Sequence, residues 1–364
     1  MIFFVSPSMK EIHMNCLKKF FLLTVAAVFA VGVFAPALKA QTELPKGKWV
    51  IGLSNSYYGN TWRKQMVDSF TEAASDAKKN GYIKDFIIQN GDGTVNAQIA
   101  QINSFILKGV DAICINAASP TALNNAIKKA LDAGIVVIAF DSIVDINGAY
   151  TMDYDWIQTN EMKTQYIADR LGNKGNVIVL RGVSGSAPDA GMYEGTMNII
   201  NKHDGLVKVA EVLGEASATK AQEAILKILP SLPEVDAVVT QGGGEAIGVV
   251  QAFEQSGRKM PIVIGDNTSE FIRWWSAAKA KDGYETISSA APPSCSSAAL
   301  WTAVNILNGM KVPHNMMLAF SVVDQNTVDQ YKDIPAGTMV APTFTNDFVV
   351  KNILEPAREE AGMK

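Results

Sequence analysis

The sequence predicts an α/β protein made of two doubly wound lobes, each built around a parallel β-sheet. Short apolar segments alternate with segments of helical period, and runs such as Ile135–Ile138 are continuously apolar, as strands covered on both faces require. A pair of signatures also repeats. The first occurrence is Val110-Asp111-Ala112 at the start of one strand, followed by Asp141 at the end of the next strand. The same pattern recurs 125 residues later as Val235-Asp236-Ala237 and Asp266. The chain therefore looks like two copies of one α/β unit.

The first 40 residues predict a secretory signal peptide rather than a folded element. Lys18 and Lys19 precede a largely apolar run from Phe20 to Phe34, and small residues follow up to Ala40. A membrane anchor is the alternative, but a spanning helix needs about 20 apolar residues and this run is shorter. We therefore expect cleavage after Ala40.

The charge and the cysteine content of the chain limit the functions that it can have. Removal of residues 1–40 takes away four lysines and one glutamate, which shifts the formal net charge from −4 to −7. The mature chain has no basic stripe, so nucleic-acid binding has no electrostatic basis. Cys114 and Cys295 remain in the mature chain; a disulfide between them is conceivable in an oxidising compartment, and free buried thiols are the favoured alternative.

The order of elements supports the two lobes. The helices are marked by apolar faces, such as the face that begins at Trp62 and the face that includes Leu123 and Ile127. A mature chain of about 320 residues is also longer than a single hydrophobic core usually accommodates, which favours two domains. Strands are expected at Trp49–Leu53, Phe86–Gln89, Ala112–Asn116, Ile135–Phe140, Val177–Leu180, Val207–Val212, Ala237–Thr240 and Pro261–Ile264.

The last third of the chain breaks the simple succession of two lobes. A helix (Ser269–Lys279), a strand (Thr286–Ser289), a helix (Ser296–Asn308) and a strand pattern (Met317–Val323) follow Asp266. This is too little for a third domain, so we expect the chain to cross back between the lobes and form a hinge. The first lobe is then expected over residues 48–150 plus about 291–315, and the second over residues 151–290 plus about 316–364.

Candidate catalytic and phosphate-binding motifs are incomplete. Gly242-Gly243-Gly244 before a helix could hold an anion, but it lacks the Lys-Ser/Thr of a P-loop, so a tight turn is favoured. Ser186 stands where a nucleophile elbow requires glycine. His203 and His314 lie near no plausible nucleophile or metal ligand in the sequence. We therefore expect no enzyme activity, no cofactor and no metal.

Several ordered motifs resemble the ribose-type periplasmic sugar-binding proteins of ABC importers, which have the type I periplasmic binding protein fold. They are the signal peptide, the polar and aromatic cluster from Asn55 to Trp62, the run QIAQINSFILKGVDAICIN from Gln98 to Asn116, and the segments Val136–Asp141 and Val235–Gly248. The resemblance covers nearly the whole mature chain, from about Trp49 to Asn308.

The resemblance implies ligand-binding roles for residues that follow the strands of both lobes. Two departures from the family pattern concern the ligand: Ser142 replaces an arginine after Asp141, and the glycine triplet replaces a polar pair after Gln241. They indicate a sugar or polyol other than ribose. The implied contacts are Asn55, Tyr58, Trp62, Asn116, Asp141, Ser142, Asp189, Gln241 and Asp266.

Structural alternatives remain open for three of these residues. Asp141 and Asp266 could cap the turns that follow them, and Trp62 could pack in the core instead of stacking on a sugar ring. The resemblance implies a monomeric periplasmic receptor that closes around its ligand and delivers it to an inner-membrane permease with its ATPase. A receptor that feeds chemotaxis or a sensor kinase is the alternative function.

Overall fold

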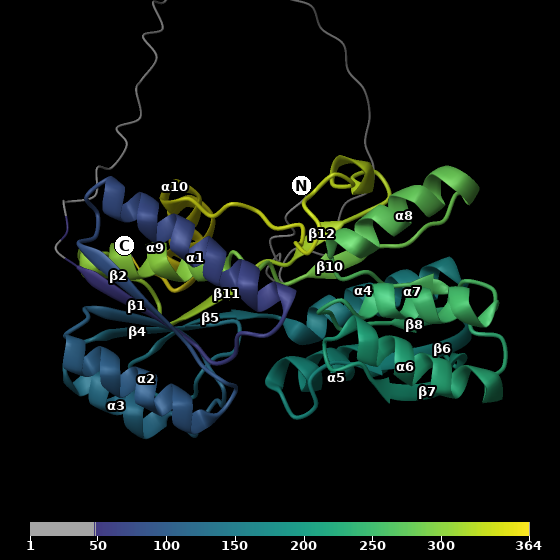
Figure 1. Ribbon diagram of the computed structural model, residues 1–364, viewed down its shortest axis with the longest axis horizontal. Coiled ribbons are helices and arrows are strands. Elements are labelled where there is room, and N and C mark those ends of the chain that lie inside the picture. The colour runs from purple at the N-terminus through teal and green to yellow at the C-terminus, as the bar shows by residue number, and fades with distance from the viewer. Residues whose placement is uncertain (1–46, 48, 364) are drawn as a thin grey trace, which may run out of the picture.

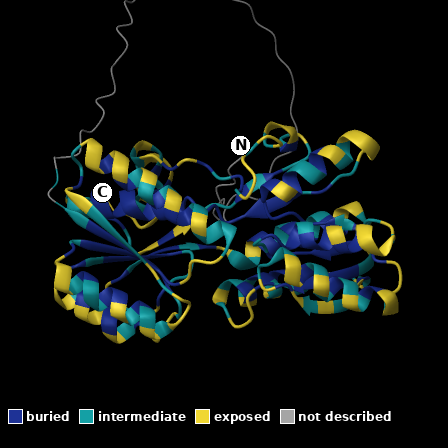
Figure 2. Cartoon of the chain, viewed as in Figure 1, coloured by how far each residue is buried: buried dark blue, intermediate teal, exposed yellow. Residues whose placement is uncertain are grey.

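The computed structural model describes residue 47 and residues 49–363, and it has two α/β lobes (Figure 1). The expected signal peptide, its cleavage site and Cys16 lie outside the described residues. Buried residues gather in the strands of both sheets and on the helix faces turned toward them (Figure 2). Within the described part of the chain, no helix has both the length and the apolar character needed to cross a bilayer.

The first lobe is a parallel sheet with the strand order β11-β5-β4-β3-β1-β2. One face packs against helices α1 and α9, and the other packs against α2 and α3 (Figure 1). Its elements are β1 (Val50–Asn55), α1 (Thr61–Lys79), β2 (Asp85–Asn90), α2 (Val95–Lys108), β3 (Ala112–Asn116), α3 (Asn124–Asp132), β4 (Val136–Phe140), β5 (Tyr150–Tyr154), α9 (Cys295–Leu307) and β11 (Asn315–Leu318).

The second lobe has a parallel sheet with the order β7-β6-β8-β9, and α4 and α5 cover one face while α6, α7 and α8 cover the other. A short antiparallel pair, β10 with β12, continues from it through a bridge between Gly265 and Ser288. The elements are α4 (Trp156–Arg170), β6 (Lys174–Arg181), α5 (Ala187–Lys202), β7 (Gly205–Leu213), α6 (Ala218–Ile228), η1 (Leu229–Ser231), β8 (Ala237–Val239), α7 (Glu245–Ser256), β9 (Ile262–Val263), α8 (Ser269–Asp282), β10 (Ser288–Ala290), β12 (Ser321–Val323) and η2 (Val328–Gln330).

The repeated Val-Asp-Ala signature has the same structural role in both lobes. An Asp111 Oδ2 atom accepts a hydrogen bond from the Val50 N–H at 2.7 Å, which ties the start of β3 to β1. Asp236 Oδ2 accepts from the Asn176 N–H at 2.7 Å and ties the start of β8 to β6. Each aspartate thus fixes one strand beside its neighbour at the amino-terminal edge of its sheet. The repeat predicted from the sequence is therefore a repeat of the fold.

The crossovers lie at positions different from those expected. Strand β5 belongs to the first sheet, so the boundary at residue 151 was placed too early. The pattern expected as one strand over Met317–Val323 is two strands, because β11 pairs with β5 in the first lobe and β12 pairs with β10 in the second. The described chain therefore crosses between the lobes after Tyr154, Ala290 and Leu318.

A fourth crossover follows Val340, and the end of the chain packs on the first lobe. Val340 lies in the core of the second lobe, whereas Phe344, Val349 and Leu354 lie in the core beneath α1 and α9. The expected assignment of residues 316–364 to the second lobe is thus wrong at both its ends. The terminal elements are α10 (Asn346–Val349), the π-helical turn η3 (Val350–Leu354) and α11 (Glu355–Glu360).

Contacts beside the crossovers join the two lobes. The Gln65 side chain on α1 accepts from the Met339 N–H at 2.8 Å and donates to the Met339 carbonyl at 3.1 Å. The rings of Tyr154, Trp156 and Phe320, which flank two crossovers, pack with centroids 4.9 to 5.3 Å apart. Because crossovers leave the first lobe at the carboxyl ends of β5 and β11, the carboxyl edge of this sheet adjoins the second lobe.

Candidate functional site

Polar side chains gather where β1, β3 and β4 end in the first lobe. Asn116 Nδ2 donates to Asp141 Oδ2 at 2.9 Å, and the Ser142 hydroxyl lies 3.4 Å from the same oxygen. Asn55 Nδ2 donates to Asn90 Oδ1 at 2.8 Å. Asp141 has a left-handed backbone with φ of 61°, a conformation that Asp and Asn tolerate better than most residues. The structure thus places Asn55, Asn116, Asp141 and Ser142 at the same edge of the first sheet.

A guanidinium group completes this cluster and was missed in the sequence. Arg63, on the first turn of α1, donates from Nη1 to Asn116 Oδ1 and to Asn55 Oδ1, the latter at 3.3 Å. Burial lowers the pKa of Arg63, and Asp141 opposes this effect. Burial likewise raises the pKa of Asp141, against the lowering effect of Arg63. The two groups therefore favour each other's charged form.

Arg63 could have been recognised as a candidate site residue from its position in the sequence. Ligands of open α/β sheets bind at the carboxyl ends of strands, where the next helix begins. Arg63 is the third residue of the helix that follows β1, and the cap residue Asn60 accepts its backbone N–H at 2.8 Å. A guanidinium group is therefore present at this edge from another element, although Ser142 stands where the family pattern has an arginine.

Trp62 and Tyr58 have different surroundings. Trp62 Nε1 donates to the Ala291 carbonyl at 2.8 Å, beside the second crossover, and its ring packs against the first core. The Arg63 guanidinium carbon lies 5.3 Å from the centroid of the same ring. These contacts support the packing alternative for Trp62 rather than stacking on a sugar. Tyr58 and its neighbour Tyr57 lie in the loop after β1 with 44% and 43% of their surfaces exposed.

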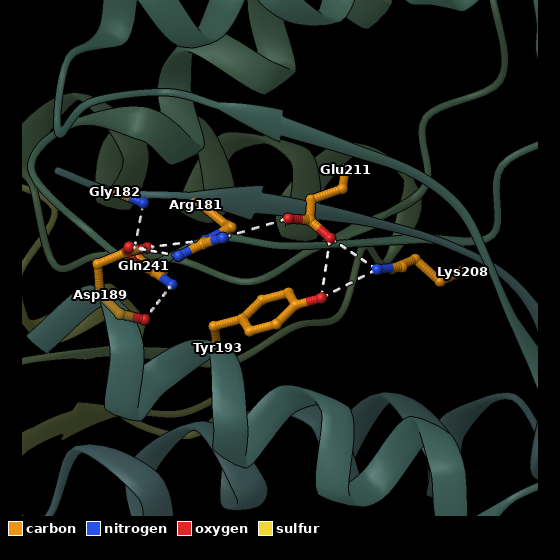
Figure 3. A network of polar contacts seen from close by, with 7 residues as sticks. All are labelled: Arg181, Gly182, Asp189, Tyr193, Lys208, Glu211 and Gln241. Carbon is orange, nitrogen blue, oxygen red and sulfur yellow. Dashed lines mark hydrogen bonds and ion pairs between the residues drawn. The ribbon is translucent and has the colours of Figure 1, made fainter. Parts of the chain in front are cut away.

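The buried Asp189 of the second lobe is held by an ion pair with Arg181, whose side chain is 24% exposed (Figure 3). The Asp189 side chain is 1% exposed and accepts two hydrogen bonds from Arg181, from Nε at 3.1 Å and from Nη2 at 2.6 Å. Arg181 also lies over the ring of Tyr193, with its guanidinium carbon 4.5 Å from the centroid. The Asp189 carboxylate is thus occupied by its own lobe, and this geometry supports a positioning role.

Gln241 connects two loops at the carboxyl edge of the second sheet. Its Oε1 atom accepts from the Gly182 N–H at 2.8 Å, and its Nε2 atom donates to the Asp189 carbonyl at 3.2 Å (Figure 3). The loop after β6 and the loop after β8 are therefore fixed relative to each other. Gln241, like Asp189, shapes this edge of the lobe through contacts within the protein.

Asp266 caps α7, and this geometry supports the capping alternative for this residue. Its Oδ2 atom accepts from the Gly244 N–H at 2.7 Å and the Ala246 N–H at 3.3 Å. Its Oδ1 atom accepts from the Thr268 hydroxyl at 2.8 Å and lies 3.4 Å from the Thr268 nitrogen. The residue is fully buried. Both oxygens therefore accept hydrogen bonds inside the lobe, whereas Asp141 faces Asn116 and Arg63.

A second buried carboxylate lies beside Asp266. Glu245, in the first turn of α7, accepts from the backbone N–H groups of Ala216, Gln241 and Gly242 at 2.9 to 3.1 Å. Burial raises its pKa to about 8. Gly242, Gly243 and Gly244 all have positive φ, so the triplet is the tight turn favoured above, and its N–H groups serve these carboxylates.

Removal of the Arg181 side chain is expected to destabilise the second lobe. An Arg181→Met substitution leaves Asp189 charged, buried and unpaired, which costs about 3 kcal/mol of the free energy of unfolding. Urea denaturation of the purified variant measures this loss. Lys208→Met is the matched control, because its partner Glu211 is 31% exposed and an exposed pair contributes less than about 1 kcal/mol. Equal stability of the two variants would contradict the prediction.

The two cysteines agree with the favoured alternative of free buried thiols. Cys114 and Cys295 are free and buried, and burial raises the pKa of both thiols. In residue 47 and residues 49–363, no group of three His, Cys, Asp or Glu side chains is placed to hold a metal ion.

Comparisons with known proteins indicate the family of this chain. The ribose import binding protein of Bacillus subtilis is 26% identical over 269 residues, which are 73% of this chain and 84% of that protein. The multiple sugar-binding periplasmic receptor of Rhizobium radiobacter is 26% identical over 278 residues, with coverage of 69% and 75%. A solved ABC transporter solute binding protein from Thermobispora bispora aligns with a TM-score of 0.78 and 34% identity, over 87% of this chain and 97% of that one. The family model described as a periplasmic binding protein domain matches residues 51–311, more than half of the chain, and the chain therefore belongs to this family.

Proposed function

We propose that this protein is the solute-binding component of an ABC importer and that it captures a sugar or sugar-like polyol between its lobes. The supporting observation is the cluster of Asn55, Arg63, Asn116 and Asp141 at the carboxyl edge of the first sheet. Amide groups offer donors and acceptors together, and a carboxylate and a guanidinium add charged partners, so one cluster can bind several hydroxyl groups. Relatives named for ribose and for multiple sugars favour the same ligand class.

In the proposed mechanism the two lobes close around the ligand and do not change it chemically. A ligand held by the first lobe is enclosed when the second lobe rotates about the crossovers, and its differential affinity for the closed form drives that rotation. We propose that the mature protein works in the periplasm as a monomer, after cleavage of residues 1–40, and presents its closed form to an inner-membrane permease and ATPase. Signalling to a chemoreceptor or sensor kinase uses the same closure; permease and ATPase genes beside this gene would favour transport.

A thermal shift panel tests the ligand class directly. We expect one neutral sugar or polyol, among pentoses, hexoses, deoxysugars, sugar alcohols and nucleosides, to raise the thermal midpoint of the mature protein. A ligand at 100 times its Kd stabilises the native state by about 2.7 kcal/mol. D-ribose, xylitol, D-allose and myo-inositol belong in the panel because relatives and solved structures of the same fold are named for them. No shift with any member would contradict the proposed ligand class.

A further inference from the structure

A buried lysine of the second lobe has no hydrogen-bond partner in the part of the chain that the structure describes. Lys163, in the middle of α4, is 1% exposed. Within residues 47 and 49–363 its ammonium makes no hydrogen bond or ion pair, although it interacts electrostatically with Asp266 and Glu245. An ammonium has three N–H donors, and burial of a charged group without hydrogen bonds is unfavourable. Such a group needs an explanation.

The direction of α4 places this ammonium toward the carboxyl edge of the second sheet. Helix α4 returns the chain to the start of β6, so its first turn lies at the edge where β6 ends and where the chain arrives from the first lobe. Side chains of an α-helix lean toward its N-terminus. Both charged groups that face Lys163, Asp266 after β9 and Glu245 on α7, lie at the same edge.

Neither carboxylate depends on Lys163. Asp266 accepts hydrogen bonds from the α7 turn and from Thr268, and Glu245 accepts from three backbone N–H groups. The hydroxyl of Thr159, one helical turn before Lys163 on α4, is likewise buried without a partner among the described residues. Thr159 and Lys163 therefore present unused hydrogen-bonding capacity on one side of α4.

We propose that Lys163 is a ligand-binding residue of the second lobe and that its ammonium donates hydrogen bonds to hydroxyl oxygens of a neutral polyol. The inference rests on the proposed function and adds a contact from the lobe opposite Arg63. The balance of charged side chains at the site favours a neutral ligand over an acidic one. The Lys163 cation is offset by the Asp266 anion, as Arg63 is by Asp141, and Glu245, whose pKa burial raises to about 8, adds little charge at pH 7. An acidic sugar would bring an anion that neither lobe balances.

The ammonium also predicts a pH dependence of binding. Burial lowers the pKa of Lys163 to about 8, and Asp266 and Glu245 partly oppose this effect. The protonated amine donates to the ligand, so affinity should be retained below about pH 8 and fall as the pH rises above it. A variant without the amine should lose this alkaline fall.

The test compares Lys163→Met with the wild-type protein and with Lys174→Met, which removes an exposed lysine from the same lobe. Calorimetry with D-ribose, D-allose, xylitol, myo-inositol and the acidic probe D-gluconate gives Kd, and thermal unfolding without ligand gives stability. We expect K163M to bind the neutral probe of the wild type about 10 to 100 times more weakly. Its ligand-free midpoint should stay equal or rise, because a buried ammonium without hydrogen bonds is removed and both carboxylates keep their own hydrogen bonds. K174M should match the wild type.

The other outcomes separate the two proposals. Unchanged affinity in K163M, or a ligand-free midpoint several degrees lower, would assign Lys163 to holding Asp266 and Glu245 and would overturn this inference alone. Tighter wild-type binding of D-gluconate than of every neutral probe would overturn the neutral ligand. Wild-type protein that binds none of these probes and no member of the thermal shift panel would refute the proposed ligand class, and the inference with it.

Discussion

Replacement of Asp141 by asparagine is expected to weaken ligand binding about 100-fold and to leave the fold intact. Asn keeps the size of the side chain and tolerates the left-handed backbone at this position, where φ is 61°. It removes the negative charge that faces Arg63 and gives Asn116 Nδ2 an amide in place of a carboxylate oxygen. Loss of charge-assisted hydrogen bonds of 1.5–3 kcal/mol each accounts for a change of about this size.

Isothermal calorimetry with the sugar that emerges from the panel measures this effect. Asp145→Asn is the matched control, because Asp145 lies in the same loop with an exposed side chain. The control should bind as the wild type does. If D141N kept the wild-type Kd, the polar cluster of the first lobe would not be the ligand site.

Replacement of Asp266 by alanine is expected to act mainly on stability, although this residue follows Asp141 by the repeat distance of 125 residues. The variant leaves the Gly244 and Ala246 N–H groups and the Thr268 hydroxyl without their buried acceptor. Each unsatisfied buried group costs about 1–3 kcal/mol, so we expect the free energy of unfolding to fall by about 4 kcal/mol. Loss of the cap at the start of α7 acts in the same direction.

Urea denaturation followed by circular dichroism measures the stability of the Asp266 variant. Asp282→Ala, at the exposed end of α8, serves as the control and should unfold at the wild-type urea concentration. A D266A protein with wild-type stability and no ligand binding would reverse our assignment and restore Asp266 as a ligand contact.

The different roles of Asp141 and Asp266 show what the sequence could and could not predict. The repeat correctly placed both residues at the carboxyl ends of strands, because each one closely follows a short apolar run. It could not tell which donors would face each carboxylate. Those donors come from Arg63 and Asn116 in one lobe and from a glycine-rich turn in the other. Partner choice depends on loops that differ between the two copies.

The misplaced crossovers have a similar physical cause. Strand β5 has the sequence YTMDY, whose polar residues gave no continuous apolar signal. It forms because β4 and β11 supply hydrogen bonds on its two sides. Lys163 was missed for a related reason, since a lysine on a helix normally indicates a solvated face and only the packed structure shows it to be buried.

The fourth crossover determines where labels must be placed to detect closure of the two lobes. Because β1 and the elements after Val340 belong to the same lobe, fluorophores near Trp49 and Met363 would move as one body and report no change in distance. A useful pair needs one label on an exposed residue of the other lobe, such as Lys202 at the end of α5. A reporter fused to either end would likewise sense ligand only through contact with the second lobe.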